Sequence, residues 1–185
     1  NLKQLGSYLK NDILLVLTKR DVLPYSLNDE KLLTYNYGIN VIDKIVVSSD
    51  KNYQMDLLYE KINKYKKNKE VYIVGYSNVG KSTLINKLIY NYSDIDYKIT
   101  TSMLPSTTIN TIEISLNDNL TLIDTPGILE SGNIINFIDN TTLKKIMPKK
   151  EIKPITYQVK NKQYINIENL IILECENKNN FTFYV

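Results

Sequence analysis

Short apolar runs recur along the first two thirds of the chain, separated by polar segments. Four of them are continuous and rich in β-branched residues, which is typical of buried parallel strands; they span residues 12–17, 44–47, 71–74 and 120–123. Apolar positions at helical spacing predict helices over residues 27–37, with Ser26 as its cap, 55–65 and 82–89. Strands that alternate with helices favour a three-layer α/β sandwich with a mostly parallel sheet and helices on both faces.

The pattern changes in the last third of the chain. Residues 109–115 and 120–123 are joined by a polar turn and predict a hairpin. Beyond Pro148 the helical periodicity ends, and strand-like pieces follow at residues 155–159, 164–167, 170–175 and 181–185. We therefore predict one domain over residues 1–148 and the start of a β-rich C-terminal module over residues 149–185.

Composition narrows the class of protein only slightly. The chain has 185 residues, 43% of them hydrophobic, which is enough for one packed domain and a piece of another. A net charge of +3 permits contact with RNA without arguing strongly for it. Cys175 is the only cysteine, which excludes an internal disulfide framework. No apolar run approaches the roughly 20 residues that span a bilayer.

A glycine loop follows the predicted strand at 71–74. The residues from Gly75 to Ser82 fit the pattern G-x-x-x-x-G-K-[ST], and a predicted helix comes next. In this context the loop N–H groups and the helix N-terminus converge on phosphates, the lysine reaches the β- and γ-phosphates, and the Ser82 hydroxyl ligates Mg²⁺. The alternative is a chance match. The predicted phosphate contacts are Ser77, Asn78, Val79, Gly80, Lys81, Ser82 and Thr83.

Two further strands end in residues suited to a guanine base. Thr18, Lys19 and Asp21 match [NT]-K-x-D at the carboxyl end of the strand at 12–17, where ligands bind in open α/β sheets. The carboxylate can accept from the ring N–H and the amino group of guanine, a donor pair that adenine lacks, while the Lys19 stem packs along the base. Ser48 and Ser49 end the strand at 44–47 and are predicted to contact the guanine carbonyl through backbone N–H groups. A solvated turn and a plain loop are the respective alternatives.

A third phosphate motif ends the strand at 120–123. Asp124 begins the sequence Asp-Thr-Pro-Gly, and we expect it to hold Mg²⁺ through a water while the Gly127 N–H contacts the γ-phosphate. Upstream lies an aperiodic polar stretch that ends in Thr107 and Thr108. We predict that Thr108, with Thr107 as second choice, closes on Mg²⁺ when GTP is bound.

The order of these motifs is unusual. In an ordinary GTPase the glycine loop opens the domain and the guanine motif follows it, but here the guanine motif comes first and Asp124 to Gly127 comes last. The sequence therefore predicts a circularly permuted P-loop NTPase fold that binds GTP or GDP with Mg²⁺. Permutation leads the chain from the γ-phosphate contact into the C-terminal module, so we hypothesise that this module reads the nucleotide state.

The motif order, the Asn-Val-Gly-Lys-Ser-Thr of the phosphate loop, residues 99–102 and residues 147–154 resemble the YqeH family of circularly permuted GTPases. The resemblance implies a GTPase that assists assembly of the small ribosomal subunit in bacteria or organelles, with that subunit or its rRNA as partner. It also implies a strand ahead of residue 1, so we expect a fragment cut at both ends. Ser106 replaces a glycine of the family, and the four cysteines of many relatives are missing.

Catalysis is predicted to depend on Lys81, Asn78 and Thr108. Ile128 stands where Ras-type enzymes place a glutamine that orients water, and Glu130 is interpreted as a loop carboxylate. Asn78 resembles an asparagine that holds K⁺ near the phosphates in relatives, so we expect slow hydrolysis that K⁺ or a ribosomal partner accelerates. Two alternatives are a non-hydrolysing GTP sensor or scaffold that binds RNA or a ribosomal protein, and a P-loop ATPase or kinase with an accidental guanine motif.

Overall fold

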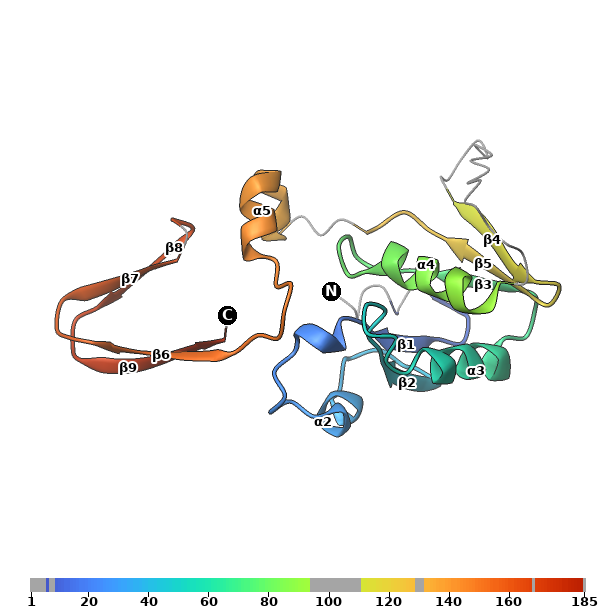
Figure 1. Ribbon diagram of the computed structural model, residues 1–185, viewed down its shortest axis with the longest axis horizontal. Coiled ribbons are helices and arrows are strands. Elements are labelled where there is room, and N and C mark those ends of the chain that lie inside the picture. The colour runs from blue at the N-terminus through green and yellow to red at the C-terminus, as the bar shows by residue number, and fades with distance from the viewer. Residues whose placement is uncertain (1–5, 7–8, 94–110, 129–131, 168, 185) are drawn as a thin grey trace.

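The computed structural model describes residues 6, 9–93, 111–128, 132–167 and 169–184. It has the predicted mixed α/β character, and the strands lie within two residues of the predicted ends wherever both ends are described (Figure 1). The strands are β1 Leu14–Leu17, β2 Asp43–Val46, β3 Glu70–Ile73, β4 Ile112–Asn117, β5 Leu120–Asp124, β6 Pro154–Val159, β7 Gln163–Ile167, β8 Ile171–Cys175 and β9 Asn179–Tyr184. The helices are η1 Arg20–Val22, α2 Asp29–Thr34, α3 Met55–Tyr65, α4 Lys81–Tyr92, η2 Ile134–Asn136 and α5 Asn140–Ile146.

The strands of the predicted, mostly parallel sheet do not join into one sheet within the described residues. They form two sheets in this region: β1 pairs with β2 in parallel, and β5 lies between a parallel β3 and an antiparallel β4. β1 and β3 exchange no ladder hydrogen bonds, so the two sheets are not joined at these strands. Exposure agrees with this, because Tyr72 of β3 is 57% exposed whereas Leu122 of β5 is fully buried.

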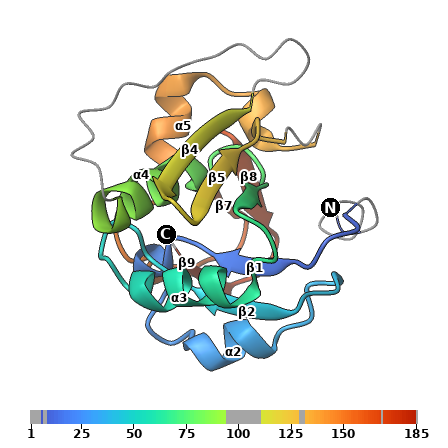
Figure 2. The same ribbon diagram turned by 90° about the vertical axis from the view of Figure 1, so that its right-hand side faces the viewer.

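A shared core nevertheless joins the two sheets. Met55, Leu58 and Ile62 of α3 and Leu84 and Leu88 of α4 pack in one cluster with apolar residues of β2, β4 and β5. This packing holds the two strand-to-helix turns, after β1 and after β3, on the same body. Both views place β2 between α2 and α3 (Figures 1 and 2).

The cap predicted for the first α-helix is also wrong. α2 begins at Asp29, and Asn28 rather than Ser26 caps it by accepting a hydrogen bond from the Lys31 N–H at 3.0 Å. Asparagine is as good an N-cap as serine, and it stands one residue before the first helical position. The helix ends at Thr34 because Tyr35 turns to an extended conformation.

The C-terminal strands form two antiparallel pairs, β6 with β9 and β7 with β8. Figure 1 shows them at the opposite end of the molecule from β4, with α5 between. Much of their surface is open, since Tyr157, Tyr164 and Ile172 are 47%, 68% and 61% exposed. Among the helices of the described ranges, none is both long and apolar enough to cross a bilayer.

Candidate nucleotide-binding site

The glycine loop connects β3 to α4, as predicted. Gly80 ends it with a φ of 92°, a conformation that favours glycine, and Asn78 has a φ of 62°, which asparagine tolerates. No side chain caps the N-terminus of the twelve-residue α4. Its first-turn N–H groups are therefore suited to an anion, which is the arrangement that phosphate binding uses.

Lys81 and Asp124 meet at the mouth of this loop. The Lys81 Nζ lies 2.6 Å from Asp124 Oδ1 and also donates to the Thr125 carbonyl oxygen. The two side chains are only 12% and 18% exposed, so water screens the pair weakly. The structure thus brings the predicted phosphate lysine and the predicted Mg²⁺ carboxylate to one point.

The segment after Asp124 runs beside the glycine loop. Ile128 donates its N–H to the Gly75 carbonyl at 3.0 Å and accepts the Ser77 N–H at 3.1 Å, in a short parallel bridge. A Cβ on Gly127 would lie 2.8 Å from Ser77 Oγ and 3.2 Å from Ser77 Cα, so a side chain at that position would crowd the glycine loop. The structure therefore uses the backbone of Ile128 to join this segment to the glycine loop.

The guanine motif lies against the same loop from the other side. Thr18 Oγ1 donates to the Val79 carbonyl at 2.5 Å, and Lys19 Nζ donates to the Asn78 carbonyl at 2.9 Å. Lys19 itself has a left-handed backbone, with a φ of 59°. These contacts join segments about 60 residues apart and align the turn after β1 with the phosphate loop.

Asp21 is held by the turn after β2. The buried Ser48 hydroxyl donates to Asp21 Oδ1 at 2.6 Å and accepts the Lys51 N–H at 3.1 Å. The backbones of the two turns are also linked, because Arg20 donates its N–H to the Val47 carbonyl at 3.0 Å. Asp21 keeps a second carboxylate oxygen, so the group retains acceptor capacity toward a base.

Comparison with known proteins identifies the family of this chain. Residues 70–182 match a protein-family model described as 50S ribosome-binding GTPase. The chain is 40% identical over 159 residues to the uncharacterized protein YqeH of Bacillus subtilis (strain 168), covering 83% of this chain and 43% of YqeH. The chain belongs to this GTPase family and is YqeH-like.

Two further relatives of the YqeH-like GTPase carry other names. This chain is 26% identical to NO-associated protein 1, chloroplastic/mitochondrial, of Arabidopsis thaliana, over 94% of this chain and 33% of that protein. It is 29% identical to GTPase Der of Burkholderia multivorans (strain ATCC 17616 / 249), over 78% of this chain and 35% of that protein. The YqeH-like GTPase therefore spans less than half the length of each relative it matches here.

The structure gathers most, but not all, of the predicted site residues. Ser82 and Thr83 follow Lys81 in the first turn of α4 and are exposed, and Ser49 is half-buried beside Ser48. Thr108, the predicted Mg²⁺ ligand, lies outside the described residues, as do Thr107, Ser106 and Glu130.

Sequence reasoning missed two features beside the guanine motif. One is Asp29, which accepts a hydrogen bond from Arg20, the variable residue of that motif. The other is the link from Ile152, which donates its N–H to the Val22 carbonyl at 2.9 Å. Asp29 lies in the first turn of a helix, where an acidic residue already interacts favourably with the helix dipole, so its sequence position does not indicate a partner in Arg20. No sequence pattern links Ile152 to Val22.

Proposed function

We propose that this YqeH-like GTPase binds GTP through a circularly permuted site, hydrolyses it to GDP and phosphate, and assists assembly of the small ribosomal subunit. The observation that carries the proposal is the contact of the turn after β1 with the phosphate loop, through Thr18–Val79 and Lys19–Asn78. It supports one ligand that is held by both motifs, a base at Asp21 and phosphates at the start of α4.

The permuted order has independent support. The family match begins at residue 70, on β3, so the guanine motif precedes it rather than falling inside it. We propose that the two sheets belong to one permuted domain, because α3 and α4 pack in a single core with strands of both sheets. We propose that residues 1–148 are the permuted domain and residues 149–185 part of a second module.

The proposed binding roles follow from the donors and acceptors present. Asp21 accepts from the guanine ring N–H and amino group, and the Lys19 stem lines the base. Backbone N–H groups of the loop and Lys81 bind the phosphates, for which Lys81 exchanges its present partner Asp124. Ser82, Asp124 and Thr108 are the residues that would hold Mg²⁺, which supplies charge neutralisation at the phosphates when bound.

Hydrolysis needs water to attack the γ-phosphorus as the bond to the β–γ bridging oxygen breaks and GDP leaves. The Ile128 side chain cannot orient that water, so we propose that the protein contributes through positioning the phosphates and stabilising their charge. Lys81 places a positive charge there, and we propose that Asn78 helps hold K⁺ beside it. If neither suffices, the protein is instead a GTP sensor, and single-turnover phosphate release separates the two.

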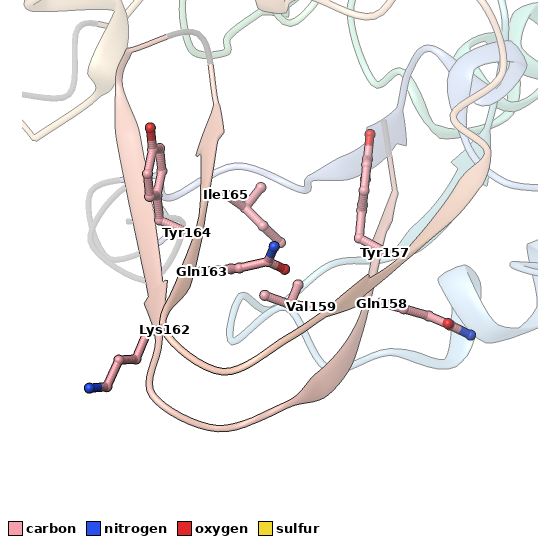
Figure 3. Close-up of a pocket in the computed structure, with 7 residues that line it drawn as sticks. All are labelled: Tyr157, Gln158, Val159, Lys162, Gln163, Tyr164 and Ile165. Atoms are coloured by element: carbon pink, nitrogen blue, oxygen red, sulfur yellow. The ribbon is translucent and has the colours of Figure 1, made fainter.

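The proposed RNA partner is supported by the C-terminal half of the chain. Between residues 144 and 162 Glu151 is the one carboxylate among seven lysines, namely Lys144, Lys145, Lys149, Lys150, Lys153, Lys160 and Lys162. Tyr157 and Tyr164 flank a cavity of about 350 Å³ in the β6–β9 and β7–β8 pairs, with Gln163 between them (Figure 3). Exposed tyrosines with nearby lysines suit stacking of unpaired bases and contact with phosphates.

Two experiments on the full-length protein test this function. Asp21→Asn replaces an acceptor carboxylate by an amide with one donor arm, so affinity should move from GTP to xanthosine triphosphate. A variant that still prefers GTP would show that Asp21 does not recognise the base.

Co-sedimentation with isolated small and large ribosomal subunits, with a GTP analogue bound, tests the partner. The matched family is described as binding the 50S subunit, and binding to that subunit alone would overturn the small-subunit role.

A further inference from the structure

One carboxylate beside the guanine motif is held by side chains of two different turns. Asp29 accepts hydrogen bonds from Arg20 Nε at 2.5 Å and from the Tyr53 hydroxyl at 2.7 Å. Gln54 Nε2 lies 3.4 Å from the same carboxylate and donates to the Tyr53 oxygen at 2.9 Å. The Arg20 and Asp29 side chains are 16% and 21% exposed, so the ion pair is shielded from most of the solvent.

These contacts are part of a closed ring of hydrogen bonds that includes the proposed guanine-binding residue Asp21. Tyr53 exchanges two backbone hydrogen bonds with Ser48, at 2.9 and 3.2 Å, and the Ser48 hydroxyl donates to Asp21. Asp21 is the chain neighbour of Arg20, and Arg20 returns to Asp29. The ring therefore passes through both turns that are proposed to read the base.

Arg20 is also the cation nearest in sequence to the base-reading carboxylate. Its Nη2 donates to the Leu27 carbonyl at 2.9 Å while its Nε engages Asp29, so the guanidinium is occupied away from Asp21. Without Asp29 only the Leu27 contact holds the guanidinium, which can then pair with the Asp21 carboxylate next to it in the chain. Such a pair uses the acceptor lone pairs that the two guanine donors need.

We propose that Asp29 is a positioning residue for guanine recognition. It holds Arg20 away from Asp21 and fixes the turn of Tyr53 and Ser48, so that the Asp21 carboxylate stays available to the base. The inference rests on the proposed function, because it presupposes a guanine nucleotide at Asp21. The same contact raises the pKa of the Tyr53 hydroxyl, since it donates to the negative Asp29 carboxylate.

The test compares two nucleotides that differ in one recognised group. Inosine diphosphate lacks the amino group of GDP, so the ratio of the two affinities reports how well Asp21 is placed. In the full-length protein Asp29→Asn should lower GDP affinity by about tenfold, the scale of a lost hydrogen bond to a charged group, and should lower the preference for GDP over inosine diphosphate. Titration calorimetry measures both affinities.

Asp43→Asn is the matched control. Asp43 also accepts from a cation, Lys61, and from a tyrosine hydroxyl, Tyr65, but it lies at the start of β2, away from both turns. Asp43→Asn should change the nucleotide preference by less than about twofold, because neither Lys61 nor Tyr65 belongs to the ring of contacts described above. Tyr53→Phe removes one hydroxyl only and should shift the preference in the same direction as Asp29→Asn, which keeps the test valid if Asp29→Asn does not fold.

The possible outcomes distinguish failure of the role of Asp29 from failure of the guanine site itself. A wild-type protein without preference for GDP over inosine diphosphate would overturn the guanine site itself. A wild-type preference that Asp29→Asn and Tyr53→Phe leave intact would overturn the role of Asp29 alone. An equal loss of affinity for both nucleotides would assign Asp29 to stability of the turn rather than to base recognition.

Discussion

Lys81 has a partner that it must give up when a nucleotide binds. Its ammonium group is bonded to Asp124 in a poorly hydrated position, so the charge is already oriented toward the mouth of the glycine loop. Lys81→Ala removes the charge that meets the β- and γ-phosphates. GTP affinity should fall at least tenfold, or about 1.4 kcal/mol, by titration calorimetry.

Lys61→Ala is the matching control for Lys81. Lys61 also pairs with a carboxylate, Asp43, and its side chain is 20% exposed, but it lies on α3. It should cost stability without lowering GTP affinity. Equal GTP affinity in Lys81→Ala and the wild type would contradict the phosphate-loop assignment.

Asn78 carries a prediction about monovalent cations. Its backbone is left-handed, and its carbonyl oxygen is taken by Lys19, which leaves the side-chain oxygen as the ligand we propose for K⁺. GTP hydrolysis by the full-length protein should rise when K⁺ replaces Na⁺ at constant ionic strength. Asn78→Ala should abolish the rise while largely sparing nucleotide affinity, as followed by phosphate release.

A glycine at the same position separates side chain from backbone. Asn78→Gly adopts the left-handed conformation without strain, so it should also lose the K⁺ response while keeping the loop geometry. Retention of the response in Asn78→Gly, or equal rates of wild type in Na⁺ and K⁺, would remove the cation role.

At the residue scale, the sequence predicted the local motifs but not the contacts between them. Thr18, Asp21 and Lys81 were predicted because each belongs to a short pattern whose chemistry depends on neighbours in the chain. The hydrogen bond from Thr18 to Val79 and the ion pair from Arg20 to Asp29 could not be predicted, since each depends on how separate turns pack. Spacing along one element carries no information about such contacts.

Between elements, β2 and α3 are joined by a charged contact outside the nucleotide site. Asp43 accepts from Lys61 and, at 2.9 Å, from the Tyr65 hydroxyl. The hydrogen bond from Lys61 lowers the pKa of the Asp43 carboxyl below its ordinary value, with smaller contributions from the Lys44 N–H and Tyr65. A lowered pKa means that the folded state favours the charged form.

The sign of the resulting pH dependence follows from this shift. The stability that Asp43 contributes is fully present above its unfolded pKa of about 3.9 and is lost as the pH falls through the lower folded value. Asp43→Asn should therefore be less stable than wild type at pH 6, and the difference should shrink toward pH 3. Urea unfolding at a series of pH values measures it; a difference that is constant with pH would contradict the assignment.

The elements themselves were predictable to different degrees. β-Branched runs fixed the strands closely, and α3 was predicted at its observed ends, because burial of one face imposes the apolar spacing. The first helix was overextended, since Leu27, Tyr35 and Tyr37 continue the apolar spacing beyond Asp29–Thr34, while no residue of that helix is buried. The split between β1–β2 and β3–β5–β4 could not be predicted from strand patterns, which do not say which strands are neighbours.

For the whole molecule, the structure adds a contact between the start of the proposed C-terminal module and the turn after β1. The chain leaves the phosphate site after Gly127, passes α5, and then returns to the guanine motif before β6. There Ile152 bonds to Val22, and the Tyr25 N–H donates to Glu151 Oε1 at 3.2 Å. Val22 is buried and directly follows Asp21, so the proposed base contact and the link to Ile152 share one short segment.

This attachment changes which nucleotide the module should respond to. GDP and GTP present the same base, so either one should stabilise the position of Val22 and slow hydrogen exchange of the Ile152 amide in the full-length protein. Mass spectrometry or NMR measures the exchange rate. The Ile42 amide is the control, because it makes a similar 3.0 Å bond to Ile13 at the far end of β1 and should not respond. Slower exchange with a GTP analogue alone would instead place the readout at the γ-phosphate, through the segment after Gly127. Exchange that neither nucleotide changes, together with one module orientation in both complexes, would mean that the module does not sense nucleotide at all.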